Sequence, residues 1–196
     1  MTKVYIIENN FFESISKENI PSNIKSRIEK YKVKNDYQNS YIAWYYLNEK
    51  LKKDFNINLE KEEIFENEYH KPYIKNIYFN LSHSEDLIAI AISNNEVGID
   101  IEIINNNKDY TLLKKKLLVD NISNEELIKK WTQIEASFKY DGTGILYSKL
   151  NEINIENVSS YKVLDRYNNS YYLSIKTNEE IKLENIKWHF IHKNTF

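Results

Sequence analysis

The chain has few of the residues that mark specialised protein classes. Its 196 residues include no cysteine, three glycines and two prolines. The absence of cysteine excludes a disulfide scaffold and thiolate chemistry. A chain of this length can instead bury a hydrophobic core that holds it together. Because a cysteine-free chain fits a reducing compartment, we expect a cytoplasmic protein.

The sequence also lacks an excess of one charge and a long apolar run. Lys and Arg number 27 and Asp and Glu 29, which gives a net charge of −2, and the two signs are interspersed. Nucleic-acid-binding proteins usually carry a basic excess, so we expect no such partner. No apolar run approaches membrane-spanning length, and the N-terminus lacks the features of a signal peptide. We therefore expect no membrane association.

The scarce glycines point to two places in the chain. A chain so poor in glycine is expected to use it at positive φ or where two backbones approach closely. Gly98 lies two residues before an acidic pair, and Gly142 and Gly144 close the segment that starts at Trp131. Both places are therefore candidates for function.

Hydrophobic periodicity predicts the order strand, helices, strands, helices, strands. The predicted helices cover 22–34, 36–53, 111–119 and 124–140. The predicted strands cover 4–8, 63–69, 77–82, 87–93, 97–104, 161–165, 171–176 and 187–191. A hairpin turn is expected at 93–96. This order predicts an α+β fold with two similar halves, 1–98 and 99–196, packed as one body.

An acidic pair alternates with isoleucines within residues 97–104. The two-residue period of a strand predicts that Ile99 and Ile101 share one face and that Asp100 and Glu102 share the other. A solvated sheet face accounts for such a pair in an ordinary strand. Two carboxylates on one face also suit a hard cation such as Mg²⁺. The pattern alone leaves both explanations open.

Two other short motifs carry groups that bind anions. Residues 79–84, F-N-L-S-H-S, predict a turn in which Ser82 and His83 offer a hydroxyl, an imidazole and backbone N–H groups to a phosphate. The alternative is an ordinary polar turn with a capping serine. Lys71 precedes Pro72, which holds it extended and directs it toward an anion. For this pair alone, an ordinary loop lysine is the favoured explanation.

A third motif places opposite charges on one helix face. Glu135 and Lys139 are four residues apart, so their side chains are neighbours on a helix. A surface ion pair is the ordinary explanation for this spacing. The same predicted helix carries Trp131, Ile134 and Phe138, which indicate that it is partly buried.

The order of these motifs resembles the 4′-phosphopantetheinyl transferases. The resemblance rests on K-P, F-N-x-S-H-S, G-I-D-I-E and W-T-x-x-E-A-x-x-K-x-x-G-x-G, between about residues 69 and 145. The chain length is similar to the pseudo-dimeric, surfactin-synthetase-activating type. This likeness implies a monomer with two halves related by a pseudo-two-fold axis and an active site in the cleft between them.

The resemblance also implies an activity. Such enzymes transfer the 4′-phosphopantetheine arm of coenzyme A to a serine of an acyl or peptidyl carrier protein, with Mg²⁺, and release adenosine 3′,5′-bisphosphate. By this likeness the metal is held by Asp100, Glu102 and Glu135. Glu135 also activates the carrier serine, and Lys139 neutralises the leaving phosphate. The residues that match the coenzyme A side are Lys71, Ser82 and His83.

The chain departs from the family pattern in several places. Ile134 replaces a lysine, His70 a glycine, and Asn39 aligns with an arginine that binds the 3′-phosphate of coenzyme A. Residues 103–130 lack the F-x-x-x-E element of the carrier-docking region. The substitutes for the arginine remain open among the N-terminal basic residues Lys25, Arg27, Lys30, Lys32 and Lys34. Two alternatives remain: a binding module without transfer activity, and an unrelated Mg²⁺-dependent phosphohydrolase.

Overall fold

A computed structural model describes residues 1–9, 20, 22–30, 32–145, 150, 152–182, 184 and 186–190. Its described helices are α1 (Ser22–Ile28), α2 (Lys34–Phe55), α3 (Thr111–Lys116) and α4 (Asn124–Asp141). The described strands before α3 are β1 (Lys3–Glu8), β2 (Phe65–Glu66), β3 (Pro72–Ile74), β4 (Ile77–Ser84), β5 (Leu87–Ser93) and β6 (Val97–Ile103). Those after α4 are β7 (Val158–Leu164), β8 (Ser170–Thr177) and β9 (Ile186–Phe190). The predicted α+β class is confirmed.

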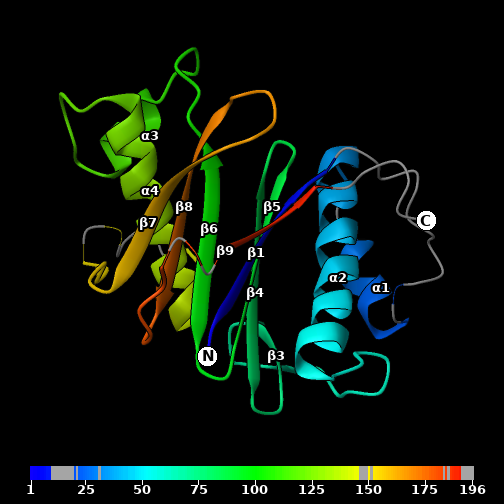
Figure 1. The fold of residues 1–196 in the computed structure, drawn as a ribbon. Helices are drawn as coiled ribbons and strands as arrows, with labels where there is room; N and C mark the ends of the chain where they lie inside the picture. The colour runs from blue at the N-terminus through cyan, green and yellow to red at the C-terminus, as the bar shows by residue number, and fades with distance from the viewer. Residues whose placement is uncertain are drawn as a thin grey trace.

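The strands form two sheets, and the helices lie outside them (Figure 1). The six-stranded sheet has the order β2-β3-β4-β5-β1-β9, and the three-stranded sheet has the order β6-β8-β7. All described pairings are antiparallel except that of β9, which runs parallel to β1. β9 therefore carries residues of the predicted second half into the first sheet.

The buried apolar residues form three clusters, which lie between these layers. One cluster packs α1 and α2 against the larger sheet, a second fills the space between the sheets, and a third lies under α3 and α4. β5 contributes to the first two, because Ile88 and Ile90 face α2 while Ala89 and Ala91 face the smaller sheet. A strand buried on both faces reads as a continuous apolar run, as β5 does.

The two sheets share a strand order. In the larger sheet β4-β5-β1 are antiparallel neighbours, and in the smaller sheet β7-β8-β6 are arranged the same way. In each set the strand that comes first in the chain, β1 or β6, is followed by two described helices and later by the other two strands, with β2 and β3 intervening in the larger sheet. The correspondence covers three strands of each sheet, and β2, β3 and β9 belong to the larger sheet alone.

Three of the predictions differ from the structure. The predicted strand 63–69 is limited to Phe65–Glu66, because His70 adopts a positive φ of 64° in the turn that follows. The predicted helix 22–34 stops at Ile28 and a new helix begins after Val33, whose backbone is extended. The segment 93–96 is not a hairpin, because β6 pairs with β8 and not with β5. The turn residues at 93–96 let the chain reverse, but they do not determine which strand β6 pairs with.

The predicted Ser-His-Ser turn is also wrong. Residues 82–84 lie in β4 and pair with β5, and the reversal comes afterwards, at Glu85 and Asp86. Glu85 takes the positive φ of 49° that closes this turn. The backbone at Ser82 and His83 is therefore part of a strand, so it does not form the phosphate-binding turn that the motif predicts.

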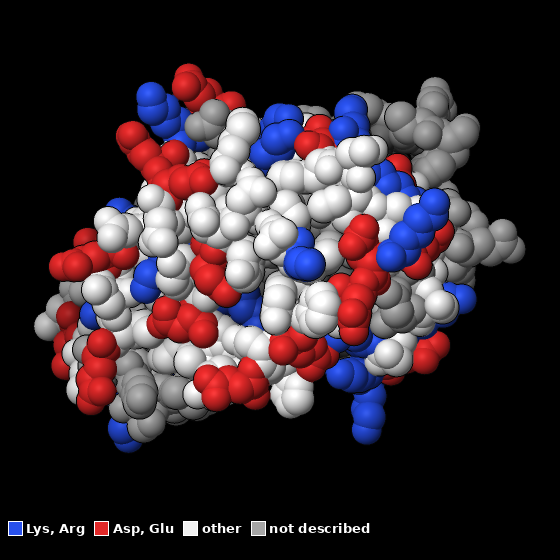
Figure 2. Space-filling model, turned by 90° about the horizontal axis from the view of Figure 1, so that it is seen from below, with Lys and Arg blue, Asp and Glu red and all other residues white. Residues whose placement is uncertain are grey.

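Figure 2 shows acidic and basic side chains interspersed over the face it presents, in keeping with the net charge of −2. Within the described residues, no helix combines the length and apolar character that a bilayer crossing requires.

Gly98 is needed where β6 crosses α4. A Cβ at this position would lie 2.0 Å from the carbonyl oxygen of Ala136 and 2.5 Å from the backbone nitrogen of Tyr140. Backbone atoms cannot move aside as a flexible side chain can, so only glycine lets the strand and the helix approach this closely. This contact sets the separation between the two elements that carry the acidic residues.

Gly98→Ala is expected to lower the free energy of unfolding by at least about 3 kcal/mol, because overpacking against backbone forces the helix away from the strand. Gly144→Ala is the matched control. Gly144 has a positive φ of 68° but no atom within 4 Å of an added Cβ. Backbone strain alone should cost it about 1–2 kcal/mol. Urea unfolding measures both, and equal losses would show that the close approach is not limiting.

Candidate active site

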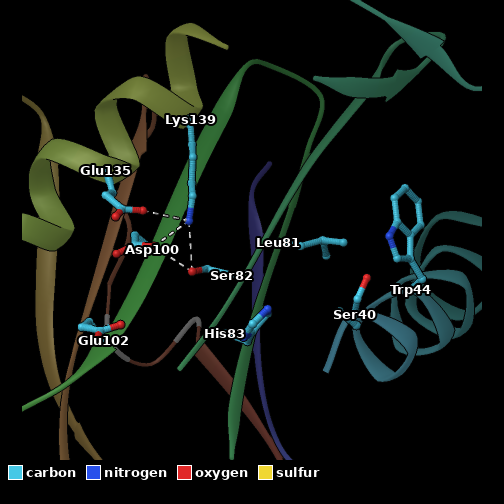
Figure 3. A pocket seen from close by; sticks show the side chains of 10 residues that line it. Ser40, Trp44, Leu81, Ser82, His83, Asp100, Glu102, Glu135 and Lys139 are labelled. Carbon is cyan, nitrogen blue, oxygen red and sulfur yellow. Dashed lines mark hydrogen bonds and ion pairs between the residues drawn. The ribbon is translucent and has the colours of Figure 1, made fainter. Parts of the chain in front are cut away.

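A cavity of about 390 Å³ opens between α2, β4, β6 and α4 (Figure 3). Its walls come from four segments that are far apart in the chain. The lining residues are Ser40, Ala43, Trp44, Leu81, Ser82, His83, Asp100, Glu102, Glu135 and Lys139. The cavity thus gathers every site residue predicted from the sequence except Lys71.

The helix α4 begins and ends at defined signals. Ser123 and Glu126 form a reciprocal capping box at its start, and Gly142 closes it in the left-handed conformation. Ile134 and Phe138 are buried in the third apolar cluster, so Glu135 and Lys139 project from another face toward β6. The orientation of the two charged side chains follows from this amphipathic pattern.

A buried hydroxyl contact anchors the same helix to β8. The Thr132 and Ser174 hydroxyls are 2.7 Å apart, and both residues are fully buried. Ser174 pairs with Asp100 across the β6–β8 ladder. The threonine of the W-T motif therefore supports the wall of the cavity from behind.

The Lys139 ammonium is the centre of the polar contacts. Its Nζ lies 2.6 Å from Asp100 Oδ1 and 3.6 Å from Glu135 Oε2. Burial lowers the pKa of Lys139, but Asp100 and Glu135 outweigh burial, and the net shift raises its pKa. The lysine is thus held in its charged form inside the cavity.

Asp100 and Glu135 share this single ammonium, and Glu102 lines the same cavity. Burial, assisted by the charge of Asp100, raises the pKa of Glu135 to about 7, although Lys139 opposes the shift. Burial and then Asp100 also raise the pKa of Glu102. Both shifts have the cause expected for an excess of negative charge in a poorly solvated space. The cavity would therefore be stabilised by a proton or by a cation.

The strand β6 is joined to β4 by side chains. Asn80 Oδ1, Ser82 Oγ and Ser84 Oγ accept hydrogen bonds from the backbone N–H groups of Ile99, Ile101 and Ile103, at 2.9, 3.3 and 3.0 Å. The acceptors follow the two-residue period of β4, and the donors follow that of β6. This side-chain ladder fixes the register of the acidic strand against β4.

His83 enters the cavity beside this ladder (Figure 3). Burial lowers its pKa, so the neutral imidazole is the dominant form at neutral pH. Asn39, where the resemblance expects an arginine, is fully buried and donates to the Glu85 carbonyl oxygen at 3.0 Å. Asn39 therefore packs the strand end near His83, and it is not among the residues that line the cavity.

Lys71 lies outside this cavity and caps the end of α4. Its Nζ binds Glu96 Oε2 at 2.6 Å and the Tyr140 carbonyl oxygen at 3.0 Å, and its side chain is 8% exposed. A cation at a helix C-terminus is favoured by the helix dipole. The structure therefore places Lys71 where it supports the helix that carries Glu135 and Lys139.

Two further hollows adjoin the cavity. One, of about 260 Å³, shares Trp44 and Leu81 with it and is also lined by Arg27 and Lys30. The other, of about 270 Å³, shares Glu102 and is lined by residues of α3 and α4, including Leu112 and Trp131. The cavity is thus continuous with a basic hollow on one side and a partly apolar hollow on the other.

Sequence reasoning missed several of the lining residues. Trp44 and Ser40, both on α2, were not among the site residues predicted from the sequence. Their four-residue spacing on one helix face was the available signal. It carries little weight because the same spacing describes a helix face that serves only as core.

The oxygen ligands of the cavity suit a hard cation. Mg²⁺ prefers carboxylate oxygens, and the surplus negative charge would be relieved by it. The residues available to hold it are Asp100, Glu102 and Glu135. As the described side chains stand, no three of them converge on one metal position. The Lys139 ammonium instead lies beside Asp100 and Glu135.

Acidic oxygens, an ammonium and an imidazole in one cavity are the groups that proteins use to bind and polarise phosphates. No protein-family model matches the chain. It is similar to a protein named 4′-phosphopantetheinyl transferase gsp from Aneurinibacillus migulanus, with 32% identity over 126 residues. The match covers 57% of this chain and 52% of that protein, so the chain spans about half the length of the relative it matches.

The raised pKa of Glu135 predicts a pH-dependent stability in the metal-free protein. Between its ordinary value of 4.5 and about 7, the folded state keeps a proton that the unfolded state has lost. This contribution to stability is present below pH 4.5 and is lost as the pH rises toward 7. Glu135→Gln removes it, so the variant should gain stability relative to the parent across this range. Urea unfolding at several pH values measures the difference; a constant difference would contradict the prediction.

The position of Lys71 predicts that its substitution weakens the fold. Lys71→Met should lower the free energy of unfolding by about 1–3 kcal/mol, because a charged hydrogen-bonding group is lost. The loss should shrink in a Glu96→Gln background, since the two residues are in contact. Urea unfolding measures both losses, and an equal loss in the two backgrounds would contradict the prediction.

Proposed function

We propose that the chain transfers the 4′-phosphopantetheine arm of coenzyme A to a serine of an apo carrier protein, with Mg²⁺, and releases adenosine 3′,5′-bisphosphate. The observation that carries this proposal is the shared cavity of Asp100, Glu102, Glu135, Lys139 and His83. The name of the partial relative supports it. We also propose that 1–98 and 99–196 are halves related by a pseudo-two-fold axis, which the repeated strand order supports.

The three carboxylates have distinct roles in this proposal. Asp100, Glu102 and Glu135 would hold Mg²⁺, which would neutralise the charge on the pyrophosphate. Glu135 also accepts the proton of the carrier serine, because its carboxylate lies in the same cavity as Lys139 and the other acidic residues. The serine oxygen then forms a bond to the phosphorus that bears the pantetheine arm.

Lys139 and His83 interact with the leaving group. The bond between that phosphorus and the bridging oxygen breaks, and adenosine 3′,5′-bisphosphate leaves with the electron pair. Lys139 neutralises the charge that develops there, and His83 donates a hydrogen bond to a phosphate oxygen. Phosphoryl transfer of this kind depends on placement and charge neutralisation more than on covalent catalysis.

The basic hollow is the proposed place for the 3′-phosphate end of coenzyme A. Of the N-terminal basic residues considered, Arg27 and Lys30 line it, and Lys25 lines a separate hollow beside Ile28. Arg27 is paired with Glu66, so a phosphate would compete with that carboxylate. Trp44 lines both the cavity and the hollow, so the rest of the ligand would lie beside it.

The carrier protein is proposed to approach from the side of α3. The hollow there opens onto Glu102 and is flanked by Leu112, whose exposed fraction is 75%. Lysines occupy the last turn of α3, so carboxylates on the partner surface would complement them. Such an approach brings a serine of the partner toward the acidic side of the cavity.

The test is a mass measurement on a panel of apo carrier proteins from fatty-acid, polyketide and nonribosomal-peptide systems. We expect a mass gain equal to the phosphopantetheine arm with coenzyme A and Mg²⁺, and none with a chelator or with a carrier lacking its serine. Glu135→Gln and Lys139→Ala should lower turnover at least about 100-fold while coenzyme A binding changes much less.

Two results would contradict the proposal. Coenzyme A binding without transfer to any carrier would identify a binding module, as the departures at Ile134 and Asn39 suggested. Release of inorganic phosphate from a simple ester would identify a phosphohydrolase. In the structure these two departures from the family pattern have packing roles. Ile134 is a core residue, and Asn39 is buried and hydrogen-bonded to Asn9 and Glu85.

A further inference from the structure

The Ser82 hydroxyl has contacts on every side. It donates to Asp100 Oδ1 at 2.7 Å, and it accepts from the Ile101 N–H at 3.3 Å and from Lys139 Nζ at 3.1 Å. A serine hydroxyl has one proton and two lone pairs, so these contacts use its full capacity. With the residue only 8% exposed, no proton remains for a phosphate oxygen.

These contacts connect the backbone of β6 to the carboxylate it carries. The N–H of Ile101 follows Asp100 directly in the chain, and one oxygen atom binds both the backbone and the side chain. Rotation of the Asp100 carboxylate away from its position would break the bond to Ser82 while the backbone stayed fixed. The serine therefore limits the carboxylate to one orientation.

Ser84 repeats the arrangement at the next position of the ladder. Its hydroxyl accepts from the Ile103 N–H at 3.0 Å. Ser84 thus shares with Ser82 the contact to the backbone of β6.

Asn80 occupies the first position of the same ladder without a carboxylate. Its Oδ1 accepts from the Ile99 N–H at 2.9 Å. The nearest acidic residue, Asp100, follows Ile99 in the chain, but its described partners are Ser82 and Lys139. Asn80 therefore makes the same kind of backbone contact as Ser82 and no described contact with a carboxylate.

We propose that Ser82 is a positioning residue, which holds the Asp100 carboxylate at the wall of the cavity where the cation would bind. The Ser82 side chain is then not a ligand of the coenzyme A phosphates. This assignment rests on the proposed function for the identity of the cation. Groups that orient metal ligands in this way typically contribute 10–100-fold to metal affinity.

The test compares Ser82→Ala with Asn80→Ala. Each variant removes one acceptor of the ladder, so both should unfold at a lower urea concentration than the parent. Mn²⁺ binding is followed by electron paramagnetic resonance at coenzyme A concentrations that saturate each variant, because Asn80 lines the hollow proposed for coenzyme A. Coenzyme A without protein is the reference. Ser82→Ala should weaken Mn²⁺ binding about 10-fold or more, and Asn80→Ala less than about threefold. Ser82→Thr, which keeps the hydroxyl, should restore most of the affinity.

Coenzyme A binding without metal separates positioning from direct contact. For Ser82→Ala this affinity should stay within about twofold of the parent. Unchanged Mn²⁺ affinity in Ser82→Ala, or an equal loss in Asn80→Ala, would overturn the proposal. A loss of metal-free coenzyme A affinity with intact Mn²⁺ binding would overturn it as well and would make Ser82 a ligand.

A second measurement keeps this inference apart from the proposed function. If the parent protein bound no Mn²⁺, the metal site of the proposed function would fail. The position of Asp100 can still be compared in ligand-free crystal structures of the parent and Ser82→Ala. The carboxylate should take a different rotamer in the variant, and an unchanged rotamer would refute the positioning role.

Discussion

The site depends on three hydrogen bonds between side chains of β4 and the backbone of β6. A backbone ladder would place neighbouring strands about 4.8 Å apart and leave no space between them. Asn80, Ser82 and Ser84 reach across instead, which keeps the strands in register and satisfies the N–H groups of β6. The two sheets are therefore joined at the place where the cavity opens, and the acidic residues lie at its wall.

Charge is the second constraint on this wall. Asp100, Glu102 and Glu135 are held near one another by elements that have independent reasons for their positions: a buried isoleucine face on β6, and an apolar face and capping box on α4. Lys139 relieves their mutual repulsion only partly, and burial together with the charge of Asp100 raises the pKa of Glu135. A fold that retains such an imbalance is suited to a site that receives a cation together with an anionic ligand.

The sequence predicted the α+β class, most of the strands and helices, and the isoleucine face of β6, because hydrophobic periods of 2 and 3.6 are local properties. The predictions failed where they depended on which strand pairs with which. Turn residues at 93–96 were expected to form a hairpin, but β6 found its partner in β8, which lies more than sixty residues later in the chain. The Ser-His-Ser motif was expected to be a turn, yet its serines extend β4 and bind β6.

The sequence by itself determined which side chains are available for chemistry and which face of each element they occupy. Ile99 beside Asp100, and Glu135 four residues before Lys139, are sufficient for that. Only the tertiary structure decided which of these groups meet. Lys71 binds Glu96 and the end of α4, while Ser82, Asp100 and Lys139 converge although they are far apart in the chain. The physical reason is that such contacts depend on how the sheets and helices pack, and the missing Cβ of Gly98 shows how closely they must do so.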